Sequence, residues 1–248
     1  AVVIPTVARE SLLRAARSVF AQDCRHTIHL LIGVDIDRHS QAAALRTQIY
    51  AECPENCQIT WLDPGFSTSK RNGGVHSCHF GGAMRTILSF LANAPVVAYL
   101  DDDDWYGPDH LREILDAIDG KQWAYTLSYY ADGDSGKALC VDEIESVGVG
   151  SGIYQERFGG FVRPSALAIN KLELASVLHF WSASIGPHGD GEDRLVFEAL
   201  ISKPHGQTGK PTVYCPIDPR DQMHSVRSTF IASRGMGLAP GSKNDSVR

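Results

Sequence analysis

The sequence lacks long apolar runs, an excess of basic charge and a paired-cysteine motif. Its uninterrupted apolar stretches fall well short of the roughly 18 residues that a membrane-spanning helix requires. The 248 residues carry 23 Lys and Arg against 29 Asp and Glu, a net charge of −6, so neither nucleic acid nor an anionic membrane is the expected partner. No charged and then apolar leader precedes the first apolar segment. We therefore expect a soluble protein with no transmembrane segment.

Cysteine is scattered rather than clustered. The six cysteines include no Cys-x-x-Cys pair, and the closest two, Cys53 and Cys57, flank a turn-like Pro-Glu-Asn. A zinc site needs a second pair of Cys or His ligands, which this spacing does not supply. Reduced thiols in the cytoplasm are the simpler interpretation, and we expect a cytoplasmic protein.

Strand-like and helix-like segments alternate through the first hundred residues. Apolar runs at 1–5, 28–34, 58–62 and 95–100 predict strands, while 9–22, 40–53 and 81–93 have the apolar spacing of amphipathic helices. Such alternation implies crossover connections and a largely parallel sheet. A length of 248 residues with 43% hydrophobic side chains suits one large domain or a domain with an appended subdomain.

The rest of the chain predicts a different mixture of elements. We expect a hairpin of strands at 122–131 and 137–147, a strand at 165–169, a helix at 171–180, a helix opened by residues 189–194 and a last strand near 211–215. Residues 148–164 are rich in glycine and aromatic residues, which indicates either a loop packed against the sheet or a wall facing a substrate. Residues 218–248 are polar, and we expect them to be irregular.

Four consecutive carboxylates, Asp101 to Asp104, directly follow an apolar strand. Ligands bind at the carboxyl ends of such strands in open α/β sheets. Two carboxylates roughly 6 Å apart repel by about 3 kcal/mol at an effective dielectric of about 20, so a cation is the natural partner. Hard oxygen ligands favour magnesium, manganese or calcium over zinc, with further ligands from a substrate diphosphate. The alternative is an acidic turn in which Asp104 or Asp109 caps the next helix.

Five segments, in this order along the chain, resemble the motifs of family 2 glycosyltransferases. They are Val2-Val3-Ile4-Pro5-Thr6 with its helix, Val34-Asp35, Arg85, Tyr99 to Asp104 with Pro108 and Leu111, and Glu192-Asp193. The resemblance runs from residue 1 to about residue 200. It implies a GT-A fold, a Rossmann-like and mostly parallel sheet flanked by helices, with a smaller acceptor-side subdomain. It also implies a nucleotide-sugar-binding half over 1–120, an acceptor-binding and catalytic half over 121–217, and a flexible C-terminal segment over 218–248.

The resemblance assigns a donor site to the first half. A divalent metal, Mn²⁺ or Mg²⁺, would bridge the diphosphate of a nucleotide sugar to the acidic motif, with Asp103 as the direct ligand, Asp101 beside it and His224 reaching in from the C-terminal segment. The nucleotide would be bound by Pro5, Thr6, Val7, Asp35, Arg85, Asp101 and Asp102. The loop before Arg85 is longer than in the family pattern, so the resemblance assigns no role to Lys70, Arg71 or Asn72.

The same resemblance makes Asp193 the general base of an inverting transfer from a nucleotide sugar, with UDP as the expected nucleotide, to a hydroxyl acceptor such as a saccharide. A sugar hydroxyl is a poor nucleophile, so a carboxylate must take its proton during the attack on the anomeric carbon. The alternative role for Glu192 and Asp193 is to complement the dipole of the helix that they open. No Gln-x-x-Arg-Trp motif follows, which favours a single transfer per binding event.

Two other functions fit part of this pattern. A sugar nucleotidyltransferase can have a similar sheet, but such enzymes carry a glycine-rich loop after the first strand, where this chain has Thr6-Val7-Ala8-Arg9. A nucleotide- or cation-binding module without turnover would keep the four aspartates and would not need Asp193 to face the donor.

Overall fold

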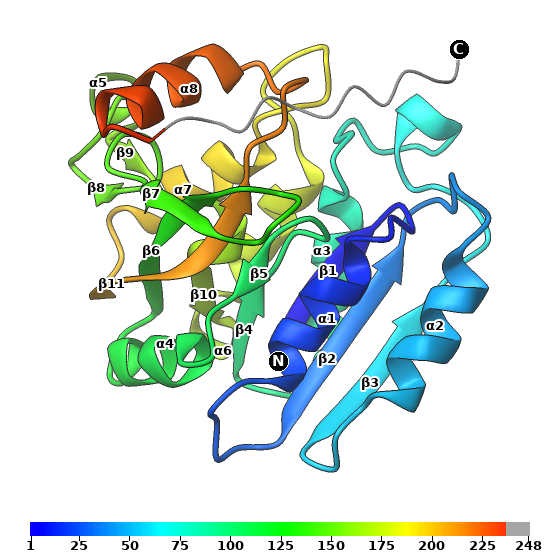
Figure 1. Cartoon of the computed structure of the whole chain (residues 1–248). Helices are drawn as coiled ribbons and strands as arrows, with labels where there is room; N and C mark the ends of the chain where they lie inside the picture. Colours follow the sequence, from blue (N-terminus) through cyan, green and yellow to red (C-terminus); the bar gives the residue numbers. More distant parts are fainter. Residues whose placement is uncertain (237–248) are drawn as a thin grey trace.

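A nine-stranded sheet forms the centre of the computed structural model, which describes residues 1–236 (Figure 1). Its strand order is β3-β2-β1-β4-β10-β6-β11-β5, and β7 pairs with the C-terminal end of β6. The strands are β1 (Val2–Thr6), β2 (Ile28–Val34), β3 (Cys57–Leu62), β4 (Val96–Tyr99), β5 (Trp105–Tyr106), β6 (Trp123–Ala131), β7 (Ala138–Val141), β10 (Leu167–Asn170) and β11 (His205–Pro216). A separate pair, β8 (Gly148–Val149) and β9 (Gly160–Phe161), makes a small second sheet.

Most strands of the large sheet run in one direction. β3, β2, β1 and β4 pair in parallel, as do β6 and β11. β10 lies antiparallel between β4 and β6, so both halves of the sheet point the same way. The expected α/β fold with a largely parallel sheet is confirmed, and the carboxyl ends of β1, β2 and β4 meet at one edge.

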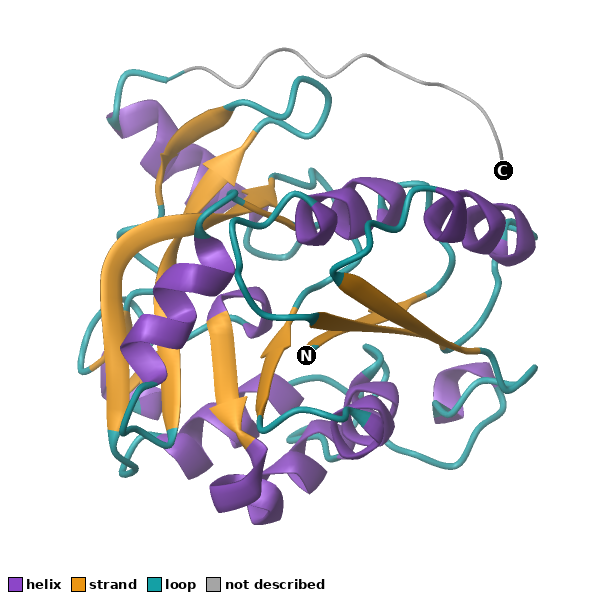
Figure 2. Ribbon diagram, turned by 90° about the horizontal axis from the view of Figure 1, so that it is seen from below, coloured by secondary structure: helices purple, strands orange, loops and turns teal. Residues whose placement is uncertain are grey.

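Helices cover both faces of this sheet (Figure 2). The amphipathic helix α1 (Leu12–Phe20) buries Leu12, Ala15, Ala16 and Val19, one face at helical spacing. In Figure 1, α1 and α2 (Ala42–Ala51) lie in front of β1 to β3, and α3 (Gly82–Leu91) lies behind them. α3 packs on the 3₁₀ helix η3 (Ala175–Ser182), which also packs on α7 (Glu192–Leu200). The remaining helices are η1 (Lys70–Asn72), α4 (His110–Ile118), α5 (Gln155–Phe158), η2 (Pro164–Ala166), α6 (Lys171–Leu174) and α8 (His224–Ser233).

The structure corrects three expectations about local structure. Residues 224–233 form α8, so the expectation of an irregular segment is wrong there, and residues 237–248 of that segment lie outside the described part. The helix expected over 171–180 is α6 followed by η3, and the strand expected over 137–147 ends at Val141. Within residues 1–236, no helix has both the length and the apolar character to cross a membrane.

Close approach of α3 to η3 depends on a glycine at the start of α3. A Cβ atom at Gly82 would lie 1.8 Å from the carbonyl oxygen of Trp181. The Trp181 ring packs on Tyr99 at the end of β4, with 4.8 Å between ring centroids. Gly82 therefore allows the contact that sets α3 against the strand that carries the four aspartates.

His110 is a fully buried histidine at the start of α4. Its Nδ1 lies 2.8 Å from the Thr212 hydroxyl, its ring stacks on Tyr106 at 3.7 Å between centroids, and its Nε2 has no partner among the described residues. Burial lowers the pKa of His110 to about 3. The folded protein therefore holds this imidazole neutral at a pH where the unfolded chain protonates it.

We predict that His110 limits stability in acid. Because its pKa lies below the unfolded value of roughly 6.5, the folded state binds fewer protons, and stability falls as the pH drops through 6.5 towards 3. Between pH 7.5 and 5 the loss amounts to about 2 kcal/mol, at about 1.4 kcal/mol per pH unit. Urea unfolding at several pH values measures it. His110→Gln is expected to flatten this dependence, and exposed His39→Gln is expected to leave it intact.

Candidate active site

The four aspartates after β4 do not share one environment. Asp102 is buried and accepts a hydrogen bond of 2.6 Å from the Thr6 hydroxyl and one of 3.3 Å from the Val7 backbone N–H. Asp103 accepts a 2.5 Å bond from Arg9, and its side chain is 45% exposed. Partial burial, followed by repulsion from its aspartate neighbours, raises the pKa of Asp103 to about 6. The end of β1 and the loop that follows it therefore hold two of the four carboxylates.

Ser165, in η2, holds the other two in place. Its hydroxyl donates to Asp104 at 2.5 Å and accepts from the Asp101 backbone N–H at 3.0 Å. Burial, then the charges of Asp103 and Asp101, raises the pKa of Asp104 to about 7. Asp109 is the N-cap residue of α4, but its side chain makes no capping hydrogen bond, and Asp104 bonds to Ser165 instead.

A buried arginine joins the acidic motif to the start of α7. Arg85, in α3, has a side chain only 5% exposed, donates through Nη2 to Asp101, and has its Nη1 3.4 Å from Glu192. The same Nη1 donates to the Phe80 carbonyl at 3.0 Å. Both terminal nitrogens of Arg85 are thus engaged by groups of this chain, and one of them contacts the acidic motif through Asp101.

Asp193 lies next to Glu192 in the first turn of α7. Burial, followed by the charge of Asp193, raises the pKa of Glu192 to about 8. Asp193 is partly exposed, and both of its carboxylate oxygens accept hydrogen bonds of 3.0 Å from Arg194 Nη1. The structure therefore connects Asp101, Arg85 and Glu192 through side-chain contacts, and places Asp193 next to Glu192 in the chain.

Asp35, at the end of β2, is buried among hydroxyl groups. It accepts bonds from the Ser67 hydroxyl at 2.7 Å and from the Thr68 hydroxyl at 2.6 Å and backbone N–H at 2.9 Å. Its own N–H donates to the Thr6 carbonyl at 2.9 Å, which ties the ends of β2 and β1 together. Pro5 and Thr6 are also buried, while Val7 is partly exposed at the same edge.

The acidic motif supplies some, but not all, of the ligands that a hard cation needs. Asp101 and Asp103 are 31% and 45% exposed, and in each one carboxylate oxygen makes no hydrogen bond within the described residues. Residues 1–236 contain no group of three or more His, Cys, Asp or Glu side chains arranged for a metal ion. Two partly exposed carboxylates fit Mg²⁺, which proteins commonly bind through one or two carboxylates together with substrate phosphates, and Mn²⁺, which prefers similar oxygen ligands.

His224 is the first residue of α8. Its Nε2 is 3.2 Å from the Ser228 hydroxyl, and its Nδ1 is buried without a partner in the part of the chain that the structure describes. It does not join Asp101 and Asp103 in a three-residue metal cluster. Its expected metal role stays a prediction.

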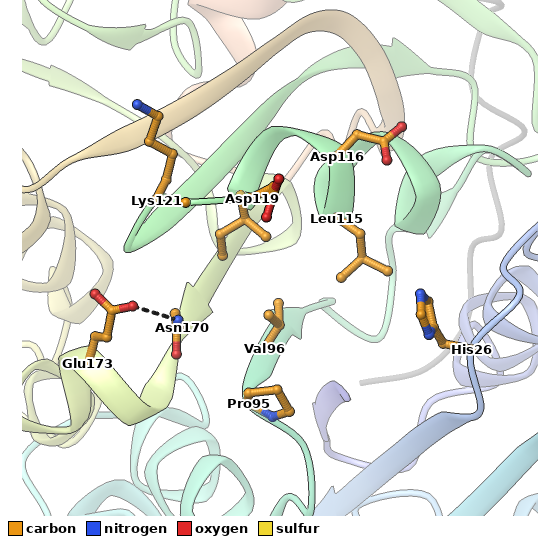
Figure 3. Close-up of a pocket in the computed structure, with 11 residues that line it drawn as sticks. His26, Pro95, Val96, Leu115, Asp116, Asp119, Lys121, Asn170 and Glu173 are labelled. Atoms are coloured by element: carbon orange, nitrogen blue, oxygen red, sulfur yellow. Dashed lines mark hydrogen bonds between the residues drawn. The ribbon is translucent and has the colours of Figure 1, made fainter.

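A cavity of about 510 Å³ lies at the opposite end of β4, away from this site (Figure 3). Pro95 and Val96, at the start of the strand, line it together with Leu115 and Asp116 of α4. Ligand sites in open α/β sheets lie at the carboxyl ends of strands, so this hollow is not the candidate active site.

Three residues of the site have no role in the sequence-based expectation: Arg9, Ser165 and Arg194. Arg194 directly follows Asp193, but adjacency alone does not indicate that its side chain turns back onto the carboxylate. Ser165 has no local signal, because it bonds to residues more than 60 positions away. The partnership of Arg9 with Asp103 likewise depends on β1 and β4 lying side by side.

Solved structures with this arrangement of elements exist, although their sequences are distant. TarS of S. aureus aligns with a TM-score of 0.62 at 14% identity, over 94% of this chain and 39% of that one. TarS 1–349 in complex with UDP-GlcNAc gives 0.60 at 12%, over 94% and 65%. The mannosyltransferase PcManGT from Pyrobaculum calidifontis, in complex with GDP-Man and Mn²⁺, gives 0.57 at 12%, over 96% and 65%.

The chain has a GT-A-type fold. It spans less than two thirds of the length of these structures. No protein-family model matches the sequence, and no curated protein matches it. In this fold, Asp101 of the acidic motif and Glu192 of α7 both contact one buried guanidinium, that of Arg85.

We predict that Arg85 stabilises the folded site. Arg85→Met would leave Asp101 and Glu192 without their shared cation, and breaking such a buried pair costs on the order of 3 kcal/mol. Urea unfolding measures the loss. Arg17→Met, which removes the exposed ion pair of Arg17 with Glu52, is expected to have a much smaller effect. Equal losses in the two variants would contradict a structural role for the Arg85 bridge.

Proposed function

We propose that this chain transfers a sugar from a nucleotide sugar to a hydroxyl group of an acceptor. The observation that carries the proposal is the Arg85 bridge, because it joins the acidic motif at the end of β4 to the Glu192-Asp193 pair of α7. A carboxylate motif for a donor and a carboxylate for an acceptor are the two parts that such a transfer needs. Structures of the same fold solved with UDP-GlcNAc and with GDP-Man support this proposal.

We assign the donor to residues 1–120. Asp35, Pro5, Thr6 and Val7 lie at adjoining strand ends, where a nucleoside would meet carboxylate, hydroxyl and backbone groups. The Ser67 and Thr68 hydroxyls orient the carboxylate of Asp35 for such a contact. UDP remains our expected nucleotide, in keeping with the family 2 resemblance.

A divalent cation, Mn²⁺ or Mg²⁺, would be held by Asp101 and Asp103 together with the donor diphosphate. When bound, it would offset the negative charge that develops on the departing nucleoside diphosphate. Asp102 would not contact the cation directly. Its hydrogen bonds with Thr6 and Val7 would keep the end of β1 against the acidic motif. His224 is a further candidate, through its unpartnered Nδ1.

We assign the acceptor to residues 121–217 and the role of general base to Asp193. The acceptor hydroxyl would lose its proton to the Asp193 carboxylate while its oxygen attacks the anomeric carbon. The bond from that carbon to the diphosphate oxygen breaks on the opposite face, which inverts the configuration. A saccharide is the expected acceptor class. The six cysteines are all free, which suits a reducing compartment such as the cytoplasm.

Release of nucleoside diphosphate from a panel of nucleotide sugars, with Mn²⁺ and with Mg²⁺, tests the proposal. We predict that one donor is hydrolysed slowly without acceptor and faster with a saccharide acceptor. Asp193→Asn is expected to lower transfer by about 10²- to 10⁴-fold, the usual contribution of a general base. Asp103→Asn is expected to lower it and to weaken the dependence on the metal.

The matched control is Asp116→Asn, an exposed aspartate of α4 at the other end of the sheet, which is expected to transfer at the normal rate. Near-normal transfer by both Asp103→Asn and Asp193→Asn would overturn the mechanism. Consumption of a nucleoside triphosphate with release of pyrophosphate would instead indicate a nucleotidyltransferase. Binding of a nucleotide sugar without turnover would indicate a binding module.

A further inference from the structure

Three aromatic rings of the glycine-rich segment 148–164 surround one cation. Cζ of Arg194 lies 4.7 Å from the ring centroid of Tyr154, 4.6 Å from that of Phe161 and 5.6 Å from that of Phe158. Tyr154 also packs on both phenylalanine rings, at 5.5 and 6.2 Å between centroids. Guanidinium groups at such distances are attracted by the ring quadrupole. We call Tyr154, Phe158 and Phe161 the aromatic cluster.

The aromatic cluster is itself held against α7. Phe161 is buried and makes an edge contact with Phe197 of the same helix, at 6.2 Å. Its strand, β9, pairs with β8, and Gly160 of β9 has a φ of 113° that only glycine adopts readily. A Cβ atom there would lie 2.1 Å from the Gly148 carbonyl oxygen, so the glycines let this hairpin close beside Arg194.

Arg194 directs its hydrogen bonds at Asp193. Its Nη1 donates to both carboxylate oxygens at 3.0 Å, and its backbone N–H donates to Oδ1 at 2.8 Å. Three bonds from one residue fix the rotation of a side chain that is itself 21% exposed. Each carboxylate oxygen has two lone pairs, so Oδ2, with a single bond, is still able to accept a proton from a hydroxyl group.

We propose that Arg194, held by the aromatic cluster, is the positioning residue of Asp193: it sets the direction of the carboxylate. The proposal rests on the proposed function, because it takes Asp193 to be the general base. A carboxylate that rotates by a small amount loses alignment with the acceptor hydroxyl, and misplacement of about 1 Å can cost roughly 100-fold in rate. The segment 148–164 thereby acts on the reaction through Arg194.

The other groups around Asp193 cannot take over this task. Glu192 is its sequence neighbour, and the Glu192 carboxyl group faces Arg85 at 3.4 Å. Arg85 is turned towards Asp101, Glu192 and the Phe80 carbonyl. The Tyr154 hydroxyl donates to Glu145, at 3.5 Å. Arg194 is the cation that the structure places in hydrogen-bond contact with Asp193 within residues 1–236.

The test compares Arg194→Met and Arg194→Lys with Arg157→Met. Arg157 is an exposed arginine of the same hairpin that stacks on Phe158, at 4.9 Å, and makes no ion pair within the described residues, so it is the matched control. Two readouts are taken on each purified variant: the NMR chemical shift of the Asp193 side-chain carboxyl carbon at pH 7, and kcat with KM for the donor. Thermal unfolding verifies that each variant is folded.

We expect the chemical shift of the Asp193 carboxyl carbon to change in Arg194→Met, because the hydrogen bonds from the guanidinium are lost. We also expect kcat to fall by about 10- to 100-fold and donor KM to change less than about threefold. Arg194→Lys keeps the charge and loses the planar fork, so kcat is expected to be only partly restored. Arg157→Met is expected to match the unmodified protein.

An unchanged Asp193 carboxyl chemical shift in Arg194→Met overturns the proposal, whatever the activity. So does an unchanged kcat in a preparation whose Asp193→Asn variant is inactive. If Asp193→Asn is fully active, the proposed role of the base fails instead, and the chemical shift still decides whether Arg194 contacts and orients the carboxylate. A variant that fails to fold is replaced by Phe158→Ala, which loosens the aromatic cluster and is expected to lower kcat in the same direction.

Discussion

Mutual repulsion among four consecutive carboxylates is the constraint around which this site is organised. Each aspartate is stabilised by a different part of the chain: Asp101 by α3, Asp102 by the end of β1, Asp103 by Arg9 and Asp104 by η2. Because these partners come from separate segments of the chain, each of those segments is fixed relative to β4. A local excess of negative charge thus specifies the relative placement of α3, β1 and η2, elements that are distant in the sequence.

Arg85 extends this order from the donor side to the acceptor side. Its guanidinium is almost completely buried and is desolvated at a considerable cost, which only well-placed carboxylates can offset. Asp101 and Glu192 meet that requirement from two separate segments, so the spacing between the acidic motif and α7 is set by the width of one guanidinium. Arg85 therefore sets a distance between two segments as well as supplying a positive charge. Arg194, two residues after Glu192, has a related role, since it holds the Asp193 carboxylate while its guanidinium packs on aromatic rings.

The elements with strong local periodicity were predictable, and those that depend on distant contacts were not. The strands β1, β2 and β4 and the helices α1, α3 and α7 follow apolar patterns that can be read directly, and the four aspartates and Asp193 stand out by composition. The helix α8 was missed because its sequence is polar and only Ile231 is buried. The bond from Ser165 to Asp104 and the aromatic cluster around Arg194 were beyond local reasoning, since each joins segments whose proximity arises only when the sheet is complete.

The position of β10 has a consequence for how the chain is made. β4 ends at Tyr99, but β10, the strand that pairs with its second edge, begins only at Leu167. β10 also pairs with β6, so it joins the two halves of the sheet. During synthesis from the amino terminus, the parallel strands β3, β2, β1 and β4 emerge well before this covering strand. An uncovered strand edge is a template for association with other chains. The nascent protein therefore passes through an interval in which an unfinished sheet, carrying its acidic motif, is exposed to aggregation until the reversed strand arrives.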